Sequence, residues 1–242
     1  MKSARRVWLA PAYVLHQYAY RDTSRIIEVF TGEYGRLSLF ARGANGPKSA
    51  SKGLLRPFQR LLVSWSGRGD AGQLVGVEID GALTQLPPSR LMSGFYLNEL
   101  LLKLTERLDP HAQVFDSYAQ CIGALSGGAA EEASLRLFEK RLLEELGYGL
   151  ELSRAASGEP IEPEGHYRYQ LEHGAQPCLA DAPGAVAGQS LTDLLQERFI
   201  DAVSLRDAKR ILRSAIDACL DGRALKSREV MRALRPRETA EP

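Results

Sequence analysis

The spacing of apolar residues changes once along this chain of 242 residues, at Pro87-Pro88. Before that pair, apolar and polar side chains alternate, as in Arg36-Leu37-Ser38-Leu39-Phe40-Ala41, which is typical of half-buried strands. After it, apolar residues recur every three or four positions, which is typical of amphipathic helices. The sequence therefore predicts an α+β protein whose strands come first and whose helices follow.

Five strands are predicted before residue 80. Five short strands hide their edges most economically by closing into a small antiparallel barrel. Alternation places Trp65 in the core with Leu61 and Val63, and Val75 on one face with Val77 and Ile79; it places Phe40 on the opposite face of its strand, with Arg36, Ser38 and Arg42. The predicted strands cover residues 7–16, 26–31, 36–41, 59–65 and 75–79.

The second part of the chain is predicted to be mainly helical. A helix capped by Ser89 runs to about Arg107, and further helices cover residues 114–125, 131–146 and 205–220. A segment rich in Gly and Pro at about 150–190 interrupts them, with a single strand at 166–171. We therefore divide the chain into a barrel domain, residues 1–80, and a helical domain, residues 81–242, which carries this insert.

Charge is distributed unevenly, although the formal net charge is only +1. Residues 1–68 carry 12 basic and 3 acidic side chains, whereas residues 151–203 carry 3 basic and 9 acidic ones. Because a partner senses the local field, this asymmetry predicts that a polyanion binds the N-terminal part.

No segment approaches the roughly 20 apolar residues of a membrane span, and the N-terminus lacks the apolar run of a signal peptide. The three cysteines, Cys121, Cys178 and Cys219, contain no Cys-x-x-Cys pair, and we expect free thiols. These features predict a cytoplasmic protein, associated with the nucleoid if it binds DNA.

Two glycine-rich strings resemble nucleotide-binding loops but lack their context. Residues 67–72 fit G-x-G-x-x-G, yet a strand rather than a helix follows, so we predict a hairpin turn. In residues 43–49, Pro47 removes an amide donor that a phosphate loop needs. No serine elbow or metalloenzyme histidine spacing is present in the sequence, and we predict a protein that is not an enzyme.

The stretch 150–190 offers three usual nitrogen or sulfur ligands, His166, His173 and Cys178. Their gaps of 7 and 5 residues match no common zinc module, so we predict neither a metal nor another cofactor. The alternative is a mixed site completed by Glu172 or Asp181.

Cations and aromatic residues are interleaved in the predicted barrel. Proteins that bind single strands use such a mixture, because cations neutralise phosphates while aromatic faces stack on bases. The alternative is that the aromatic residues form the core and the arginines a solvated surface. The candidate DNA-binding residues are Arg5, Arg6, Arg21, Arg36, Phe40, Arg42, Lys48, Lys52, Arg56 and Arg60.

Several motifs resemble the RecO family of bacterial DNA repair and recombination mediators. They are Val14-Leu15-His16, the turn Phe30 to Arg36, Arg42-Gly43-Ala44 with the following lysine-serine loop, Leu55-Arg56-Pro57-Phe58 and Leu225-Lys226-Ser227-Arg228. The resemblance covers the whole chain and implies an N-terminal oligonucleotide-binding (OB) barrel followed by an α-helical domain. Many members carry a four-cysteine zinc module where this chain has only Cys178, which implies a zinc-free member.

The resemblance also implies the activity and the partners. Such a protein binds single- and double-stranded DNA, anneals complementary strands and, with RecR, helps to load RecA onto DNA coated by single-strand-binding protein. The acidic tail of single-strand-binding protein would need an apolar groove rimmed by cations. Candidates on two predicted helices, which could equally be solvated polar faces, are Arg136, Lys140, Arg141, Arg206, Lys209, Arg210 and Arg213.

Two other classes of function remain open from the residues alone. An adapter that binds only proteins would explain the helices but not the basic barrel. A DNA-processing enzyme such as a nuclease would need a carboxylate cluster, and only Asp22, Glu28 and Glu33 precede residue 70.

Overall fold

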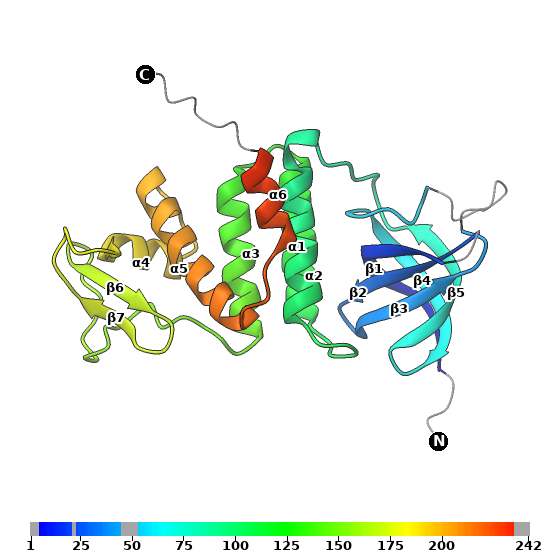
Figure 1. Ribbon diagram of the computed structural model, residues 1–242, viewed down its shortest axis with the longest axis horizontal. Coiled ribbons are helices and arrows are strands. Elements are labelled where there is room, and N and C mark those ends of the chain that lie inside the picture. Colours follow the sequence, from blue (N-terminus) through cyan, green and yellow to red (C-terminus); the bar gives the residue numbers. More distant parts are fainter. Residues whose placement is uncertain (1–4, 21–22, 45–52, 235–242) are drawn as a thin grey trace. The chain divides into compact units, whose positions relative to one another are not determined.

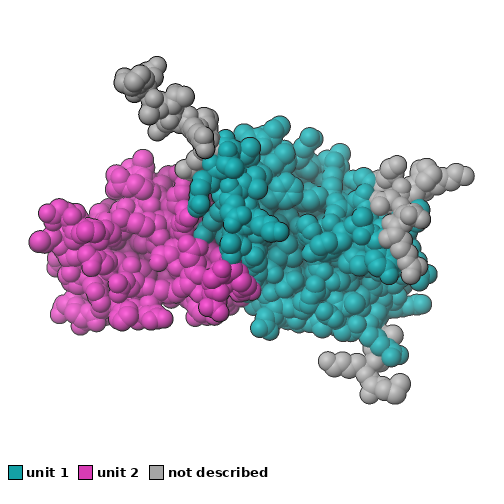
Figure 2. All heavy atoms as spheres, in the orientation of Figure 1, with its two compact units in different colours: residues 1–127, 224–242 teal, residues 128–223 magenta. Residues whose placement is uncertain are grey.

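The computed structural model describes residues 5–20, 23–44 and 53–234 (Figure 1). The chain forms two compact units, residues 1–127 with 224–242 and residues 128–223 (Figure 2). Unit 1 contains the barrel and the helices that directly follow it. The division predicted near residue 80 thus falls inside unit 1, and an independently folding barrel stays a prediction.

The first part of unit 1 is a closed barrel with strand order β1-β2-β3-β5-β4. Neighbouring strands are antiparallel, except that β3 and β5 pair in parallel between residues 38–40 and 71–73. The predicted five-stranded barrel is confirmed, and β1 extends past the predicted end at His16. The strands are β1 (Arg5–Tyr20), β2 (Ser24–Thr31), β3 (Gly35–Ala41), β4 (Arg60–Arg68) and β5 (Ala71–Ile79).

Alternating residues fill the barrel, including Leu37, Leu39, Leu61 and Val63. The prediction that Val75 shares a face with Val77 and Ile79 is wrong. The β4–β5 pairing shifts by one residue between Ser64 and Trp65. Such a bulge reverses the direction of the side chains that follow, so Leu74 joins Val77 and Ile79 against the core and Val75 is exposed.

Unit 1 continues with a 3-10 turn (Pro88–Arg90), α1 (Leu91–Leu104) and α2 (Ala112–Ser126). Ser89 does not cap a helix as predicted; it lies in the 3-10 turn, and Arg90 is the residue before α1. The helix also ends before the predicted Arg107, because Thr105 turns to an extended conformation and its hydroxyl donates to the carbonyl of Leu101.

A short C-terminal helix that the sequence analysis missed, α6 (Lys226–Leu234), returns to unit 1 and packs against α1. The carboxylate of Glu99 accepts hydrogen bonds from the backbone N–H groups of Lys226 and Ser227 at 2.9 and 2.8 Å, and one from the Ser227 hydroxyl at 2.7 Å. These donors would otherwise have no intrahelical acceptor, so Glu99 caps α6 from a distant part of the chain.

Unit 2 packs α3 and α4 against α5, and a small sheet of order β7-β6-β8 contacts α5. The predicted strand at 166–171 is present as β6, but the two strands beside it were not predicted. They are four and three residues long, too short for alternation to show. The elements are α3 (Glu131–Glu145), β6 (His166–Gln170), β7 (Gly174–Pro177), β8 (Ala185–Ala187), α4 (Gly188–Leu195) and α5 (Ala202–Leu220).

The helices predicted at 114–125, 131–146 and 205–220 correspond to α2, α3 and α5, with ends that differ by at most three residues. The start of α5 lies earlier than predicted because Asp201 and Ser204 form a capping box. Within the part of the chain that the structure describes, no helix combines the length and apolar character that a membrane crossing requires.

Candidate nucleic-acid interface

The outer face of β1, β2 and β3 is divided into a covered and an open part. In the covered part, Tyr13 and Phe30 pack against Phe115 of α2, with ring centroids 5.4 and 5.8 Å away, and Tyr13 also contacts Tyr118 at 4.8 Å. These outward-facing aromatic residues are therefore buried by helices, and only the far end of the face is left for a ligand.

The loop between α1 and α2 continues the barrel wall beside β3. The N–H of Leu108 donates to the carbonyl of Arg36 at 3.0 Å, next to the place where Ser38 pairs with Asp70 at the start of β5. Gly35 adopts a φ of +66°, and a side chain there would collide with the backbone of Asp109. Glycine at this position thus allows the loop to lie directly against the strand.

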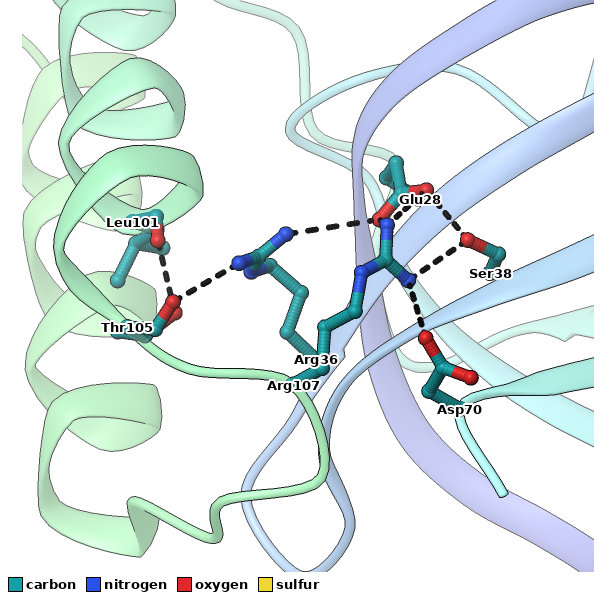
Figure 3. Close-up of polar contacts among 7 residues, drawn as sticks. All are labelled: Glu28, Arg36, Ser38, Asp70, Leu101, Thr105 and Arg107. Atoms are coloured by element: carbon teal, nitrogen blue, oxygen red, sulfur yellow. Dashed lines mark hydrogen bonds and ion pairs between the residues drawn. The ribbon is translucent and has the colours of Figure 1, made fainter.

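A buried carboxylate, Glu28, joins this loop to the barrel (Figure 3). Nη2 of Arg107 donates to both carboxylate oxygens of Glu28 at 2.8 Å, and Nη1 donates to the Ser38 hydroxyl at 2.8 Å. The Ser38 hydroxyl in turn donates to Glu28. Asp70 lies 3.6 Å from the Arg107 guanidinium and completes its polar surroundings.

Arg36 belongs to the same network. Its guanidinium lies 3.7 Å from Glu28 and donates to the carbonyl of Thr105 at 2.8 Å. Burial and the neighbouring charge of Arg107 lower the pKa of Arg36. The Arg36 side chain is only 12% exposed, so its charge is used to hold the α1–α2 loop on the barrel.

Beyond this network the face is open and aromatic. Tyr18, Ile26 and Phe40 lie opposite one another on β1, β2 and β3, and residues opposite one another share a face. Tyr18 is 51% and Tyr20 is 38% exposed, and the Tyr20 ring meets the Phe40 ring edge to face at 5.2 Å. We call Tyr18, Tyr20 and Phe40 the aromatic platform.

A hollow of about 320 Å³ lies on the platform, lined by Tyr20, Ile26, Ser38, Phe40, Ala71 and Gly72. This volume lies at the lower end of the range for ligand clefts, roughly 300–1,000 Å³. The exposed guanidinium of Arg42 lies 5.8 Å from the Phe40 ring, and Ser38 links the hollow to Arg107. The hollow therefore offers ring faces with cations nearby.

The nine cations among the predicted DNA-binding residues fall into three groups. Arg5, Arg6, Arg42 and Arg56 are exposed, and Arg5 lies 4.4 Å from the centre of the Tyr34 ring. Arg36 and Arg60 are engaged, because Arg60 forms a 2.6 Å ion pair with Asp80 that raises the pKa of Arg60. The remaining candidates, Arg21, Lys48 and Lys52, lie outside the described residues.

The two contrasting aromatic predictions can be compared directly. Trp65 is buried and meets Tyr34 edge to face at 5.1 Å, which confirms its place in the core. Phe40 is half-buried on the outer face, as alternation predicted. It contacts Tyr20 and lines the hollow, so it is not an isolated exposed ring.

In unit 2, most of the cations suggested for a peptide groove are paired. Arg136 and Lys140 are buried, and Arg136 lies 2.6 Å from Glu139. Lys140 and Arg141 both bind Glu197, at 3.2 and 2.6 Å, and these bonds lower the pKa of Glu197.

On α5, Lys209 binds Glu132 at 2.7 Å, and Arg210 donates to the carbonyl of Ala185. Arg206 and Arg213 project furthest, with side chains 73% and 52% exposed. Their nearest acidic partners lie 3.7 and 3.8 Å away, respectively.

The three residues considered as zinc ligands do not meet in one cluster. Within the described ranges, no group of three or more His, Cys, Asp and Glu side chains is arranged to hold a metal ion. His166 and Cys178 are joined through their backbones, by a 2.8 Å hydrogen bond. Tyr167 is buried and its hydroxyl accepts from the N–H of Glu162, while burial raises the pKa of Tyr169 to about 12.

Three residues of this interface were missed by the sequence analysis. Tyr18 and Tyr20 follow His16 at intervals of two, so extending the predicted first strand would have placed them on one face. Arg107 carried no such signal, because its role depends on a contact with a residue 79 positions earlier.

A closed five-stranded barrel with an open aromatic face, followed by helices, defines a class of proteins that join an oligonucleotide-binding barrel to an α-helical region. Residues 4–81 match the family model described as Recombination protein O N terminal, and residues 86–229 match Recombination protein O C terminal. The chain belongs to the RecO family.

Curated relatives named "DNA repair protein RecO" align over nearly the full length. The protein of Dechloromonas aromatica is 43% identical over 93% of this chain and 95% of its own. That of Nitrosococcus oceani is 44% identical over 95% of both chains, and that of Alkalilimnicola ehrlichii 43% over 96% and 94%. Membership places the chain among DNA repair and recombination proteins.

Proposed function

We propose that this protein is a non-catalytic mediator of DNA repair and recombination that binds single-stranded DNA on the aromatic platform of its barrel. The observation that carries the proposal is the pair of exposed rings of Tyr18 and Tyr20, next to the half-buried Phe40 and the exposed Arg42. Ring faces stack on any base, and nearby cations neutralise the phosphates, so binding would depend little on sequence.

The exposed cations of the barrel would contact the phosphates. The exposed candidates are Arg5, Arg6, Arg42 and Arg56. We include Arg21, Lys48 and Lys52 in the proposal because of their positive charge alone. Arg36 and Arg60 would act indirectly, by holding the barrel in shape. Double-stranded DNA would bind through the same cations but without stacking, because its bases are already paired.

Stacking on the platform would also promote annealing. A base held by its face keeps its hydrogen-bonding edge exposed to a complementary strand. The same proposal includes RecR as a partner and the loading of RecA onto DNA coated by single-strand-binding protein, as the family resemblance implies.

For the acidic tail of single-strand-binding protein, the exposed Arg206 and Arg213 of α5 are the best-placed cations among the seven candidates. Charge reversal at both positions should weaken binding of a tail peptide in a calorimetric titration. Charge reversal at Arg136 or Lys140 would instead place a second carboxylate beside Glu139 or Glu197, and should lower stability.

A nuclease is the less favoured alternative on this face. Glu28 is bound by Arg107 and Arg36, and Asp70 lies against Arg107, so these carboxylates are committed to arginines. Incubation of single-stranded DNA with the protein and magnesium is expected to yield no cleavage products. Cleavage that requires Asp70 would overturn the non-catalytic proposal.

A fluorescence-anisotropy titration with a labelled single-stranded oligonucleotide at several salt concentrations tests the proposal. We expect salt-dependent binding that Phe40→Ala and Tyr18→Ala each weaken. Leu83→Ala, which changes an exposed apolar residue between the barrel and α1, serves as the control. Equal affinity of all three variants would remove the platform from DNA binding.

A further inference from the structure

A second wall of the barrel, formed by β1, β4 and β5, also presents apolar side chains to solvent. Two bulges flank Ser64 of β4: the pairing with β1 shifts between Val7 and Ala10, and the pairing with β5 shifts between Ser64 and Trp65. The bulges expose Trp8 by 64%, Leu9 by 49% and Val75 by 55%. We call these three residues the bulge patch.

A hydrogen bond to β4 supports the bulge in β1. Leu9 adopts a φ of +50°, which residues other than glycine and asparagine rarely take. Its N–H donates to the hydroxyl of Ser64 at 3.0 Å, and this bond replaces the missing one of the ladder. Strained backbone that is supported in this way is concentrated at functional sites.

Cations lie at one end of the bulge patch. Arg6 pairs opposite Ser66 of β4, and Arg68 ends that strand. Both side chains are exposed, and neither has a hydrogen bond or ion pair with any residue of the described ranges. At the other end Glu78 lies opposite Leu62, so a polyanion would be attracted to one end and repelled at the other.

We propose that the bulge patch is a second binding site for single-stranded DNA, in which the ring of Trp8 stacks on a base while Arg6 and Arg68 contact phosphates. This inference rests on the proposed function. The occupant is a nucleic acid because the exposed ring shares a wall of the barrel with two arginines that have no side-chain partner among the described residues, in a segment with 12 basic and 3 acidic residues. A partner with a neutral apolar surface would gain nothing from these charges.

The two sites would give the barrel a direct role in annealing. The aromatic platform lies on β1, β2 and β3, whereas the bulge patch lies on β1, β4 and β5. One barrel could thus hold a strand on each wall, and a complementary pair would be kept at a high effective concentration.

Intrinsic fluorescence reports on Trp8 selectively. The chain has two tryptophans, and the other one, Trp65, is buried in the barrel. In the Trp65→Phe variant, titration with a short oligo-dT should quench the emission of Trp8. The same titration of Trp8→Phe, which retains Trp65, should give little quenching. Because this variant keeps the buried Trp65, it provides a test that does not depend on correct folding of Trp65→Phe.

Two functional readouts accompany the spectra. Trp8→Ala should retain tight binding of a first oligonucleotide in anisotropy, but weaken the second binding event about tenfold, as expected for the loss of one stacked base. It should also slow annealing of two complementary oligonucleotides. Phe40→Ala should weaken the first event and leave quenching of Trp8 at high DNA concentration.

The outcomes separate this inference from the proposed function. Unchanged Trp8 emission at saturating DNA, or normal annealing by Trp8→Ala, overturns the second site while binding on the platform stands. An emission change that depends on protein concentration alone assigns the patch to a second copy of the chain and overturns it too. Failure of every variant and of the parent chain to bind DNA overturns the proposed function itself.

Discussion

The guanidinium of Arg107 donates to both carboxylate oxygens of Glu28 at 2.8 Å and thereby ties the α1–α2 loop to the outer face of the barrel. The Glu28 side chain is only 6% exposed, whereas the Arg107 side chain is 35% exposed. The pair closes one end of the aromatic platform and determines how much of that face is open.

Replacement of Arg107 by alanine should lower the free energy of unfolding. Removing Arg107 leaves the buried carboxylate with the hydrogen bond from Ser38 and the longer contact to Arg36, which we expect to cost about 3 kcal/mol, the lower end of the range for breaking a buried pair. Urea denaturation measures this loss. Arg68→Ala, at an exposed arginine, should change stability by less than about 0.5 kcal/mol. The double variant Arg107→Ala/Glu28→Gln should recover part of the lost free energy of unfolding, because it no longer buries an unpaired charge. If the double variant is destabilised as much as Arg107→Ala alone, the loss does not come from the pair between Arg107 and Glu28.

Phe40 and Trp65 should respond in opposite ways to alanine. Phe40→Ala should cost about 1–3 kcal/mol in binding of single-stranded DNA, because it removes an aromatic ring that lines the hollow and could stack on a base. Trp65→Ala should cost about 3–5 kcal/mol in stability, because it leaves a cavity in the barrel core. Thermal melting and anisotropy of both variants check this. A stable Trp65→Ala protein with weakened DNA binding would contradict the assignment.

The salt dependence of DNA binding should identify the cations that contact phosphates. Arg42→Ala and Arg56→Ala should each reduce the slope of log affinity against log salt by about 0.7, the value for one contact on a single strand. Arg36→Ala should instead lower stability, since its side chain is paired and largely buried. Arg168→Ala, at an exposed position of unit 2, is the control that should leave the slope unchanged.

Docking of α6 should depend on the charge of Glu99. Burial opposes ionisation of Glu99, but hydrogen bonds from Ser227 and Lys226 outweigh it and lower the pKa below its usual value of 4.5. A carboxyl whose pKa is lowered by folding stabilises the folded state above its unfolded pKa, and loses that contribution as the pH falls through the folded pKa. Glu99→Gln should therefore reduce stability at pH 7 by about 1–2 kcal/mol, as for loss of a helix cap.

The difference between Glu99→Gln and the parent protein should shrink as the pH falls below about 4.5. Chemical denaturation at a series of pH values measures it. If the difference in stability stays constant down to pH 3, packing of the Glu99 side chain rather than its negative charge stabilises the position of α6. Glu106→Gln, at an exposed carboxylate just beyond α1, should show no such dependence.

Unit 2 should fold without metal. Its sheet is held by backbone pairing and by the buried Tyr167, whose hydroxyl accepts from the N–H of Glu162. Addition of a chelator should leave the melting temperature unchanged, and the residues around the small sheet should be among the first cleaved by protease. One equivalent of zinc in protein purified without added metal, with a chelator-dependent loss of melting temperature, would contradict this prediction and assign Cys178 as a ligand.

Local patterns in the sequence were sufficient for the barrel. Alternation over a few residues predicted β3 in place and put Trp65 inside and Phe40 outside. Such predictions succeed because the side-chain period of a strand is a property of the strand itself. They failed at Val75, where a single bulge in the pairing with β4 reversed the pattern.

Tertiary contacts decided which of the predicted candidates are available to a ligand. From the sequence, Arg36 and Arg42 are equally good candidates for a phosphate contact. In the structure, Arg36 is bound by the buried carboxylate of Glu28 and by the α1–α2 loop, whereas Arg42 is exposed. The same holds for Arg136 and Arg206 in unit 2, of which one is buried beside Glu139 and the other projects into solvent.

The sequence by itself thus determined that five strands precede the helices, the basic character of the barrel and, apart from Val75, the two faces of its strands. The tertiary structure alone decided the extent of the aromatic platform, because its border is a pair between Arg107 and Glu28, 79 residues apart. It also decided the place of α6, through Glu99 and a residue 128 positions later. No local period encodes such contacts: they form only when the folded chain brings the two groups together, and burial then makes their pairing necessary.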